Sequence, residues 1–198
     1  MMKKITLILT LFILVSMFIT ACNDSDATTS SPNSVPIISL SENLDILEKE
    51  AKSWQSDAYL AWVNIYIRIE YPENAQVLTA QFYSPSSESE SLAVKMSLEG
   101  VITQEPVDHS IPVYQQDPIT LDDWNIDTQE ALDMMLDQDG LRFLKSQDEE
   151  QCSFLRLERL RYKPEQPVVW RLTLMECLGD YVRHILLDPI TGEFLEND

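Results

Sequence analysis

Alternation of apolar and polar side chains most restricts the fold of this 198-residue chain. Ile65, Ile67 and Ile69 alternate with polar neighbours, a two-residue period that predicts a β-strand over residues 60–71 with one buried face. Further runs of the same kind predict strands at 76–84, 92–98, 152–162, 167–178 and 181–188. We therefore expect antiparallel strands to make up much of the fold.

Each set of three predicted strands is preceded by a predicted helix. Ser39 and Glu42 have the spacing of a capping box, and leucines and alanines follow at helical intervals. Asp127 and Glu130 repeat this pattern, and Gly140 ends the second helix. The predicted fold class is α+β, with two tandem units, each a helix packed on a three-stranded antiparallel sheet.

The turns between strands predict their pairing. A turn at 72–75 places Ile65 opposite Phe82, so that apolar residues of both strands share one face. A loop at 163–166 places Leu157 opposite Leu172, and a two-residue turn at 179–180 places Leu172 opposite Leu187. The second register also brings Glu158 opposite Arg171, which favours an ion pair across the strands.

The N-terminus has the pattern of a bacterial export signal. Lys3 and Lys4 precede an apolar run, and the tetrapeptide at 19–22 resembles a lipobox, in which a diacylglycerol is attached to the cysteine before cleavage. We expect residues 1–21 to be a signal peptide and Cys22 to anchor the chain to a membrane through acyl chains. The alternative is an uncleaved transmembrane helix, for which the apolar run is near the lower length limit.

Lipidation of Cys22 would leave Cys152 and Cys177 as the remaining thiols. The predicted register places these two residues opposite each other, and an exported chain with such a pair is a candidate for a disulfide. The alternative is two free thiols packed as small apolar side chains.

The chain is strongly acidic, with 14 basic and 33 acidic residues and a formal charge of −19. Such a polyanion is repelled by nucleic acids and by anionic headgroups, so neither is an expected partner. The acidic residues either form a solvated surface or attract cations or basic partners.

The predicted segments are a tether at 22–38, a first unit at 39–101, a connector at 102–125 and a second unit at 126–198.

Motifs of catalysis or metal binding are missing from the sequence. The two histidines, His109 and His184, belong to no zinc or hydrolase motif, so we predict no catalytic residue, metal ligand or cofactor. The letters at 137–140 partly match a calcium loop, but the end of a helix explains them as well. Trp62 and Tyr66 lie on the opposite face of their strand from Ile65 and Ile67, and they are our candidate binding surface.

Two parts of the chain have recognisable short motifs: residues 54–60 with 82–84, and the ending at 168–172 and 187–194 with its Asp-x-x-Thr-Gly-Glu sequence. In these segments the chain resembles bacterial PepSY-like lipoproteins. The first copy lacks the Thr-Gly-Glu ending, and Leu78 stands where a tryptophan is expected. The resemblance implies a small non-catalytic α+β module that binds, inhibits or assists folding of another exported protein, as PepSY domains in peptidase propeptides do.

Together these features predict a lipoprotein in the cell envelope, held on the extracytoplasmic side of a membrane by its N-terminal lipid. Its expected role is a non-catalytic protein-binding or regulatory module, which includes inhibition of a peptidase. The alternative role is the binding of a solute or a cation, which the negative charge favours.

Overall fold

The computed structural model of this protein contains eight strands and two α-helices in the part of the chain that it describes. The described residues are 37–67, 77–108, 117–140, 153–163, 165–175 and 182–196. The first half contains α2 (Leu40–Trp54), β1 (Tyr59–Ile67), β2 (Val77–Ser84), β3 (Ser87–Ser97) and β4 (Ile102–Asp108). The second half contains η1 (Leu121–Asp123), α3 (Thr128–Met135), a π-helical turn η2 (Leu136–Gly140), β5 (Ser153–Arg159), β6 (Val168–Met175), β7 (Val182–Leu187) and β8 (Phe194–Leu195).

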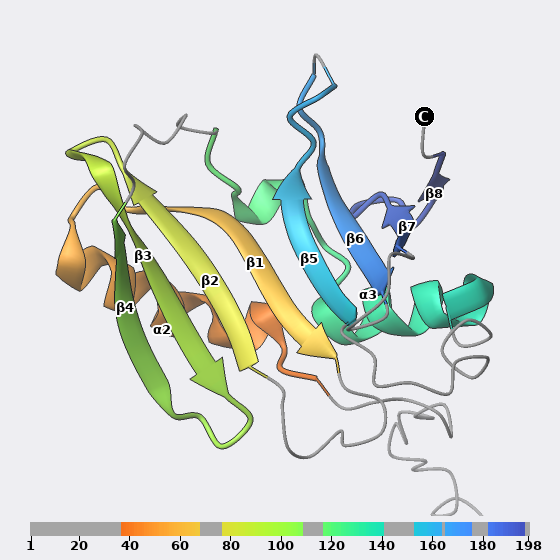
Figure 1. Cartoon of the computed structure of the whole chain (residues 1–198), viewed down its shortest axis with the longest axis horizontal. Helices are drawn as coiled ribbons and strands as arrows, with labels where there is room; N and C mark the ends of the chain where they lie inside the picture. The colour runs from red at the N-terminus through yellow and green to blue at the C-terminus, as the bar shows by residue number, and fades with distance from the viewer. Residues whose placement is uncertain are drawn as a thin grey trace, which may run out of the picture. The chain divides into compact units, whose positions relative to one another are not determined.

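All eight strands belong to one antiparallel sheet with the order β4-β3-β2-β1-β5-β6-β7-β8 (Figure 1). The prediction of two tandem units with separate three-stranded sheets is therefore wrong. The halves join where β1 pairs with β5, for example through Ile65 opposite Leu155. Each half does begin with a helix that is followed by its strands, as the sequence predicts, but four strands follow each helix.

The union of the halves has a physical reason. In two separate sheets, β1 and β5 would each leave a row of backbone N–H and C=O groups unpaired at an edge. Pairing β1 with β5 satisfies these groups along the register from Val63 opposite Leu157 to Ile67 opposite Ser153. This pairing joins segments about 90 residues apart in the chain, so no local sequence pattern predicts it.

One hydrophobic core fills the space between the sheet and the helices. It contains buried residues of α2 such as Leu47, of α3 such as Leu132, and of the sheet such as Ile65, Leu155 and Trp170. Figure 1 shows α2 behind β2 and β3, and contacts of α3 with β6 and β7 place that helix on the second half of the sheet. Both helices thus contribute to the same core, and among the described residues neither of them has the length and hydrophobicity to cross a membrane.

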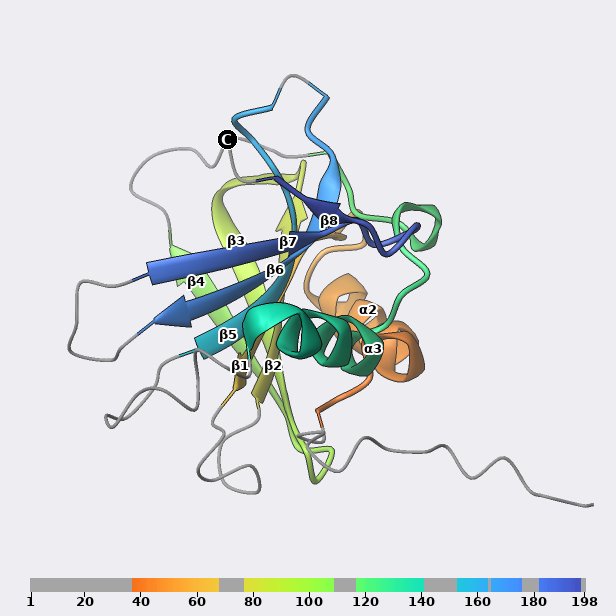
Figure 2. The ribbon, with the colours of Figure 1, turned by 90° about the vertical axis from the view of Figure 1, so that its right-hand side faces the viewer.

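The two helices start side by side, and Asp127 joins them (Figure 2). The sequence predicts Asp127 as the N-cap of the second helix, and it does occupy that position, but its side chain makes no N-cap hydrogen bond and within α3 contacts Thr128. Its carboxylate instead accepts hydrogen bonds from the backbone N–H groups of Leu40 and Ser41, at 3.1 and 3.2 Å, in the first turn of α2. It also accepts hydrogen bonds from the hydroxyl groups of Ser39 and Ser41, at 2.6 and 2.8 Å. One carboxylate therefore stabilises the start of the other half's helix.

The predicted strand registers have the right faces but the wrong partners. Ile65 lies opposite Leu78 rather than Phe82, a shift of four residues. Leu172 lies opposite Leu155 and Ile185, so both later pairings are shifted by two residues. Because side chains alternate between faces with a period of two, an even shift keeps every apolar residue on the same face.

Two segments outside the predicted strands contain strand. The polar stretch after Ser84 forms a tight hairpin in which Ser84 pairs with Ser87. The carboxylate of Asp57 stabilises this turn by accepting hydrogen bonds from the hydroxyl groups of Ser84 and Ser86, at 2.5 and 2.6 Å. The start of the predicted connector forms β4, where Pro106 is tolerated because β4 is the edge strand of the sheet.

Candidate functional site

The face of the sheet opposite the helices carries the residues that the sequence singled out. Along β1, Val63, Ile65 and Ile67 are buried in the core, and the intervening side chains belong to the opposite face. Trp62 and Tyr66 are two of these, so the structure places both predicted residues on the same uncovered side of one strand. Tyr66 is 52% exposed, and Trp62 is half-buried.

Strand β5 contributes an arginine and a third aromatic ring to this side of the sheet. The guanidinium of Arg156 lies over the ring of Trp62, 4.9 Å from its centroid, and 5.2 Å from the ring centroid of Phe154. Its Nε donates a hydrogen bond of 3.2 Å to Oδ1 of Asn64. The rings of Tyr66 and Phe154 meet edge to face with centroids 6.2 Å apart. We call these four side chains, Trp62, Tyr66, Phe154 and Arg156, the arginine–aromatic patch.

A charged row continues from this patch onto β6. Arg156 lies directly opposite Arg171 in the β5–β6 pairing. The carboxylate of Glu158 interacts with both arginines: it forms an ion pair with Arg171 and lies 3.8 Å from Nη1 of Arg156. The predicted pair of Glu158 and Arg171 therefore forms, although the two residues are diagonal neighbours because Glu158 lies opposite Val169.

His184 on β7 extends this row. Its Nδ1 lies 3.1 Å from the hydroxyl oxygen of Thr173, the residue opposite it on β6. Partial desolvation lowers the pKa of His184, and the positive charge of Arg171 lowers the pKa further. The imidazole therefore stays neutral at neutral pH and adds a hydrogen-bonding group rather than a charge.

Sequence reasoning found half of the arginine–aromatic patch. It identified Trp62 and Tyr66 from the face that they share on one strand, and it missed Phe154 and Arg156. Those two residues come from β5, and only the β1–β5 pairing brings them to Trp62 and Tyr66. The signal that was available is the alternation on β5, which puts Phe154, Arg156 and Glu158 on the face away from the core.

Other predicted residues stay untested. Cys22, Cys152, Cys177 and His109 lie outside the described residues. The β5–β6 register, from which the pairing of Cys152 with Cys177 was predicted, differs from the predicted one by two residues. The disulfide therefore stays a prediction, and the register from which it was predicted differs from the observed one.

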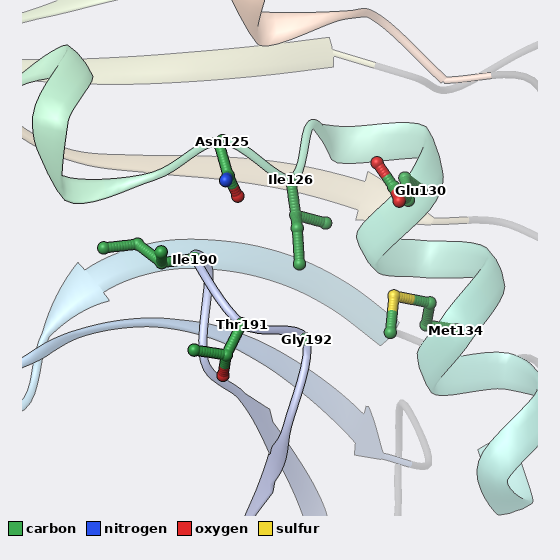
Figure 3. A pocket seen from close by; sticks show the side chains of 7 residues that line it. All are labelled: Asn125, Ile126, Glu130, Met134, Ile190, Thr191 and Gly192. Carbon is green, nitrogen blue, oxygen red and sulfur yellow. The ribbon is translucent and has the colours of Figure 1, made fainter.

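A pocket of 350 Å³ lies between the start of α3 and the turn that follows β7 (Figure 3). Ile126 and Met134 form apolar walls, and Asn125, Glu130 and Thr191 provide polar groups. The pocket is also lined by Ile190 and Gly192.

Backbone hydrogen bonds hold the shape of this pocket. The carbonyl of Pro189 accepts hydrogen bonds from the N–H groups of both Asn125 and Ile126, each at 3.0 Å. Oδ1 of Asp188 accepts hydrogen bonds from the N–H groups of Ile190 and Thr191, each at 2.8 Å, which closes the turn. The Asp-x-x-Thr-Gly-Glu sequence thus turns the chain after β7, but a further short strand, β8, follows it.

The described residues that line the pocket offer few groups of the kinds used in catalysis. Glu130 is its one acidic lining residue, and the lining contains no histidine, cysteine, serine or lysine. Within the described part of the chain, no group of three or more histidine, cysteine, aspartate or glutamate side chains could hold a metal ion. The arginine–aromatic patch is therefore the better candidate for a functional site.

Comparisons with known proteins give one distant similarity. No family model matches the chain, so the resemblance to PepSY domains stays a prediction. No curated protein matches it in sequence. The chain is similar to a crystal structure of a protein from Clostridium difficile 630 that is described only provisionally as a lipoprotein. The two share 14% sequence identity with a TM-score of 0.49, over 86% of this chain and 95% of the other.

Proposed function

We propose that this protein is a lipoprotein anchored on the extracytoplasmic side of a membrane, where it acts as a non-catalytic module that binds another exported protein. The observation that carries the binding role is the placement of Arg156 over Trp62, beside Phe154 and Tyr66, on the face that the helices leave uncovered. Arginine, tryptophan and tyrosine are the residues that most often dominate the energy of protein interfaces. Regulation or inhibition of a peptidase is one form that this binding can take.

The anchor is supported by the lipobox-like tetrapeptide that ends at Cys22 and by the polar tether that follows it. Its test is the Cys22→Ala variant, expressed in bacterial cells that process lipoproteins. We expect the wild-type chain to be in the membrane fraction with acyl groups on its N-terminal peptide, detected by mass spectrometry, and the variant to lack them. An unmodified Cys22 in the membrane-bound wild-type chain would overturn the proposed anchor.

The binding role is tested by affinity capture from envelope extracts with the mature protein as bait. We expect Tyr66→Ala and Arg156→Gln to lose most of the specifically captured protein. Tyr162→Ala is the matched control, because Tyr162 is also exposed, at 63%, but lies in the connection between β5 and β6. Capture that is unchanged in the two patch variants would place the binding surface elsewhere.

A further inference from the structure

The arginine–aromatic patch and its neighbour Arg171 contain an unusual excess of positive charge. Arg156 and Arg171 lie directly opposite each other across β5 and β6. Like charges in this position destabilise a sheet. Among the described residues, a single carboxylate, that of Glu158, is shared between them. Stability alone would favour a second acidic or a neutral residue at one of these positions.

The two guanidinium groups have more donors than their partners in the sheet use. Each guanidinium carries five N–H donors, whereas a carboxylate accepts about four hydrogen bonds. Arg156 uses Nε for Asn64 and shares Glu158 with Arg171. The side chains of Arg156 and Arg171 remain 31% and 25% exposed, while that of Glu158 is 16% exposed. Part of each arginine side chain therefore faces solvent, whereas the side chain of Glu158 lies deeper.

The charge of this region differs from that of the chain as a whole. Residues 153–187 contain six basic and four acidic residues, whereas the complete chain has 14 basic and 33 acidic residues. The distant acidic residues act on a ligand mainly through screened interactions, because the Debye length is about 8 Å at physiological ionic strength. At contact distance, the two arginines determine which charge the patch prefers.

From these observations we infer that the arginine–aromatic patch, together with Arg171, recognises a carboxylate-bearing segment of the protein partner. This inference rests on the proposed function and specifies its ligand. A carboxylate forms short, charge-assisted hydrogen bonds with guanidinium groups. The rings of Tyr66 and Phe154 beside Arg156 provide an apolar surface for an aromatic or aliphatic side chain next to that carboxylate. The preferred ligand is thus an acidic residue beside a large apolar one.

Selection from a randomised eight-residue peptide library on the mature protein in detergent micelles tests this ligand class. We expect the selected peptides to be enriched in aspartate or glutamate next to an aromatic or aliphatic residue. Replacing the acidic residue by its amide in a selected peptide should weaken binding about tenfold or more, as should Arg156→Gln or Arg171→Gln. Arg156→Lys keeps the charge and loses the planar donors, so it should lie between wild type and Arg156→Gln.

Lys95→Gln is the matched control for these variants. Lys95 lies on the same face, in the row of Asn64 and Thr79, and forms an ion pair with Glu105 away from the patch. We expect it to change binding less than about twofold. Thermal unfolding of each variant shows whether it is folded, and Arg156→Lys supplies the result if Arg156→Gln fails to fold.

The outcomes separate the ligand class from the binding role. Selected peptides that depend on Tyr66 but show no enrichment in acidic residues would overturn the inference and leave the proposed function standing. An effect of Lys95→Gln equal to that of Arg156→Gln would also overturn the inference, because it would indicate a general response to charge. Binding to phosphatidylglycerol vesicles in place of peptides would overturn both the inference and the protein-binding role.

Discussion

On β5, Leu155 and Leu157 belong to the core, whereas Phe154, Arg156 and Glu158 lie on the other face of the same strand. The helices cover the first set completely, so its side chains are fixed by packing. The second set is half-buried by its own neighbours and keeps charged groups within reach of solvent. The contrast teaches that one strand can supply stability on one face and recognition on the other, because its side chains alternate.

The largest expected effect comes from the covered face. Leu155→Ala removes a fully buried side chain where β5 pairs with β1, and it should lower the free energy of unfolding by about 3 kcal/mol. Urea unfolding followed by circular dichroism measures this loss. Leu121→Ala is the control, because Leu121 is exposed in η1, and it should cost less than about 0.5 kcal/mol.

The form of that transition is a second test of the shared core. Because both halves contribute to one sheet and one core, Leu155→Ala should shift a single transition rather than one of two. Two separate transitions, with one unchanged by the substitution, would contradict the union of the halves.

The next largest effect is expected at the junction of the helices. Asp127→Ala removes the carboxylate that caps α2 and should cost about 2 kcal/mol. Asp122→Ala, at an exposed aspartate of η1, is the matched control and should leave the unfolding midpoint nearly unchanged. Equal losses in the two variants would mean that general charge, rather than capping, accounts for the effect.

Acid should remove the contribution of Asp127. Burial of its carboxyl raises the pKa, but hydrogen bonds from Ser39, the backbone of Thr128 and Ser41 outweigh burial and hold the pKa below its usual 3.8. A lowered pKa in the folded state stabilises the protein above the unfolded value, and that stability is lost as pH falls through the folded pKa. The difference in unfolding free energy between wild type and Asp127→Asn should therefore be constant near neutral pH and shrink below about pH 4. A constant difference down to the lowest pH at which the protein folds would argue against this origin.

A smaller effect is expected at the turn after β7. Gly192 has a φ of +73°, and a Cβ there would lie 2.9 Å from Cε of Met134, so Gly192→Ala should cost about 1–2 kcal/mol. Gly100 has nearly the same φ, +77°, but a Cβ at that position would meet nothing within 4 Å, so Gly100→Ala isolates the backbone cost. The excess loss in Gly192→Ala measures the contacts with Met134 and Ile126, and it should become smaller when Met134 is also changed to alanine.

The smallest effect on stability is expected on the uncovered face. Arg156→Gln removes the cation–π contacts and should lower the free energy of unfolding by less than about 1 kcal/mol. Chemical denaturation measures this loss, and Leu155→Ala, at the neighbouring position of β5, is measured for comparison. A loss as large as that of Leu155→Ala would mean that the arginine–aromatic patch is part of the structural core.

Much of the local structure could be predicted from the sequence. The helix start at Ser39 and the face on which Ile65 and Ile67 lie both follow from patterns within a few residues. The strand registers could not be fixed, because every even shift pairs apolar residues with apolar residues. The hairpin after Ser84 was missed because its polar turn is stabilised by Asp57, which lies 27 residues earlier in the chain.

The candidate site divides in the same way. Trp62 and Tyr66 were found because they share a face of one strand, which alternation alone decides. Arg156 was missed because its contact with Trp62 depends on a pairing between distant strands.

The sequence by itself determined the order of the two helices and of six of the eight described strands, the side of each of these strands that is buried, and the negative charge. The lipid attachment at Cys22 stays a prediction. These properties depend on residues that are neighbours in the chain. Only the tertiary structure decided that the two halves share one sheet, that Asp127 caps the helix of the other half, and that Arg156 lies over Trp62. Each of these depends on contacts between distant segments. The first two contacts give hydrogen-bond partners to backbone N–H and C=O groups that would otherwise stay unpaired at strand edges and helix ends.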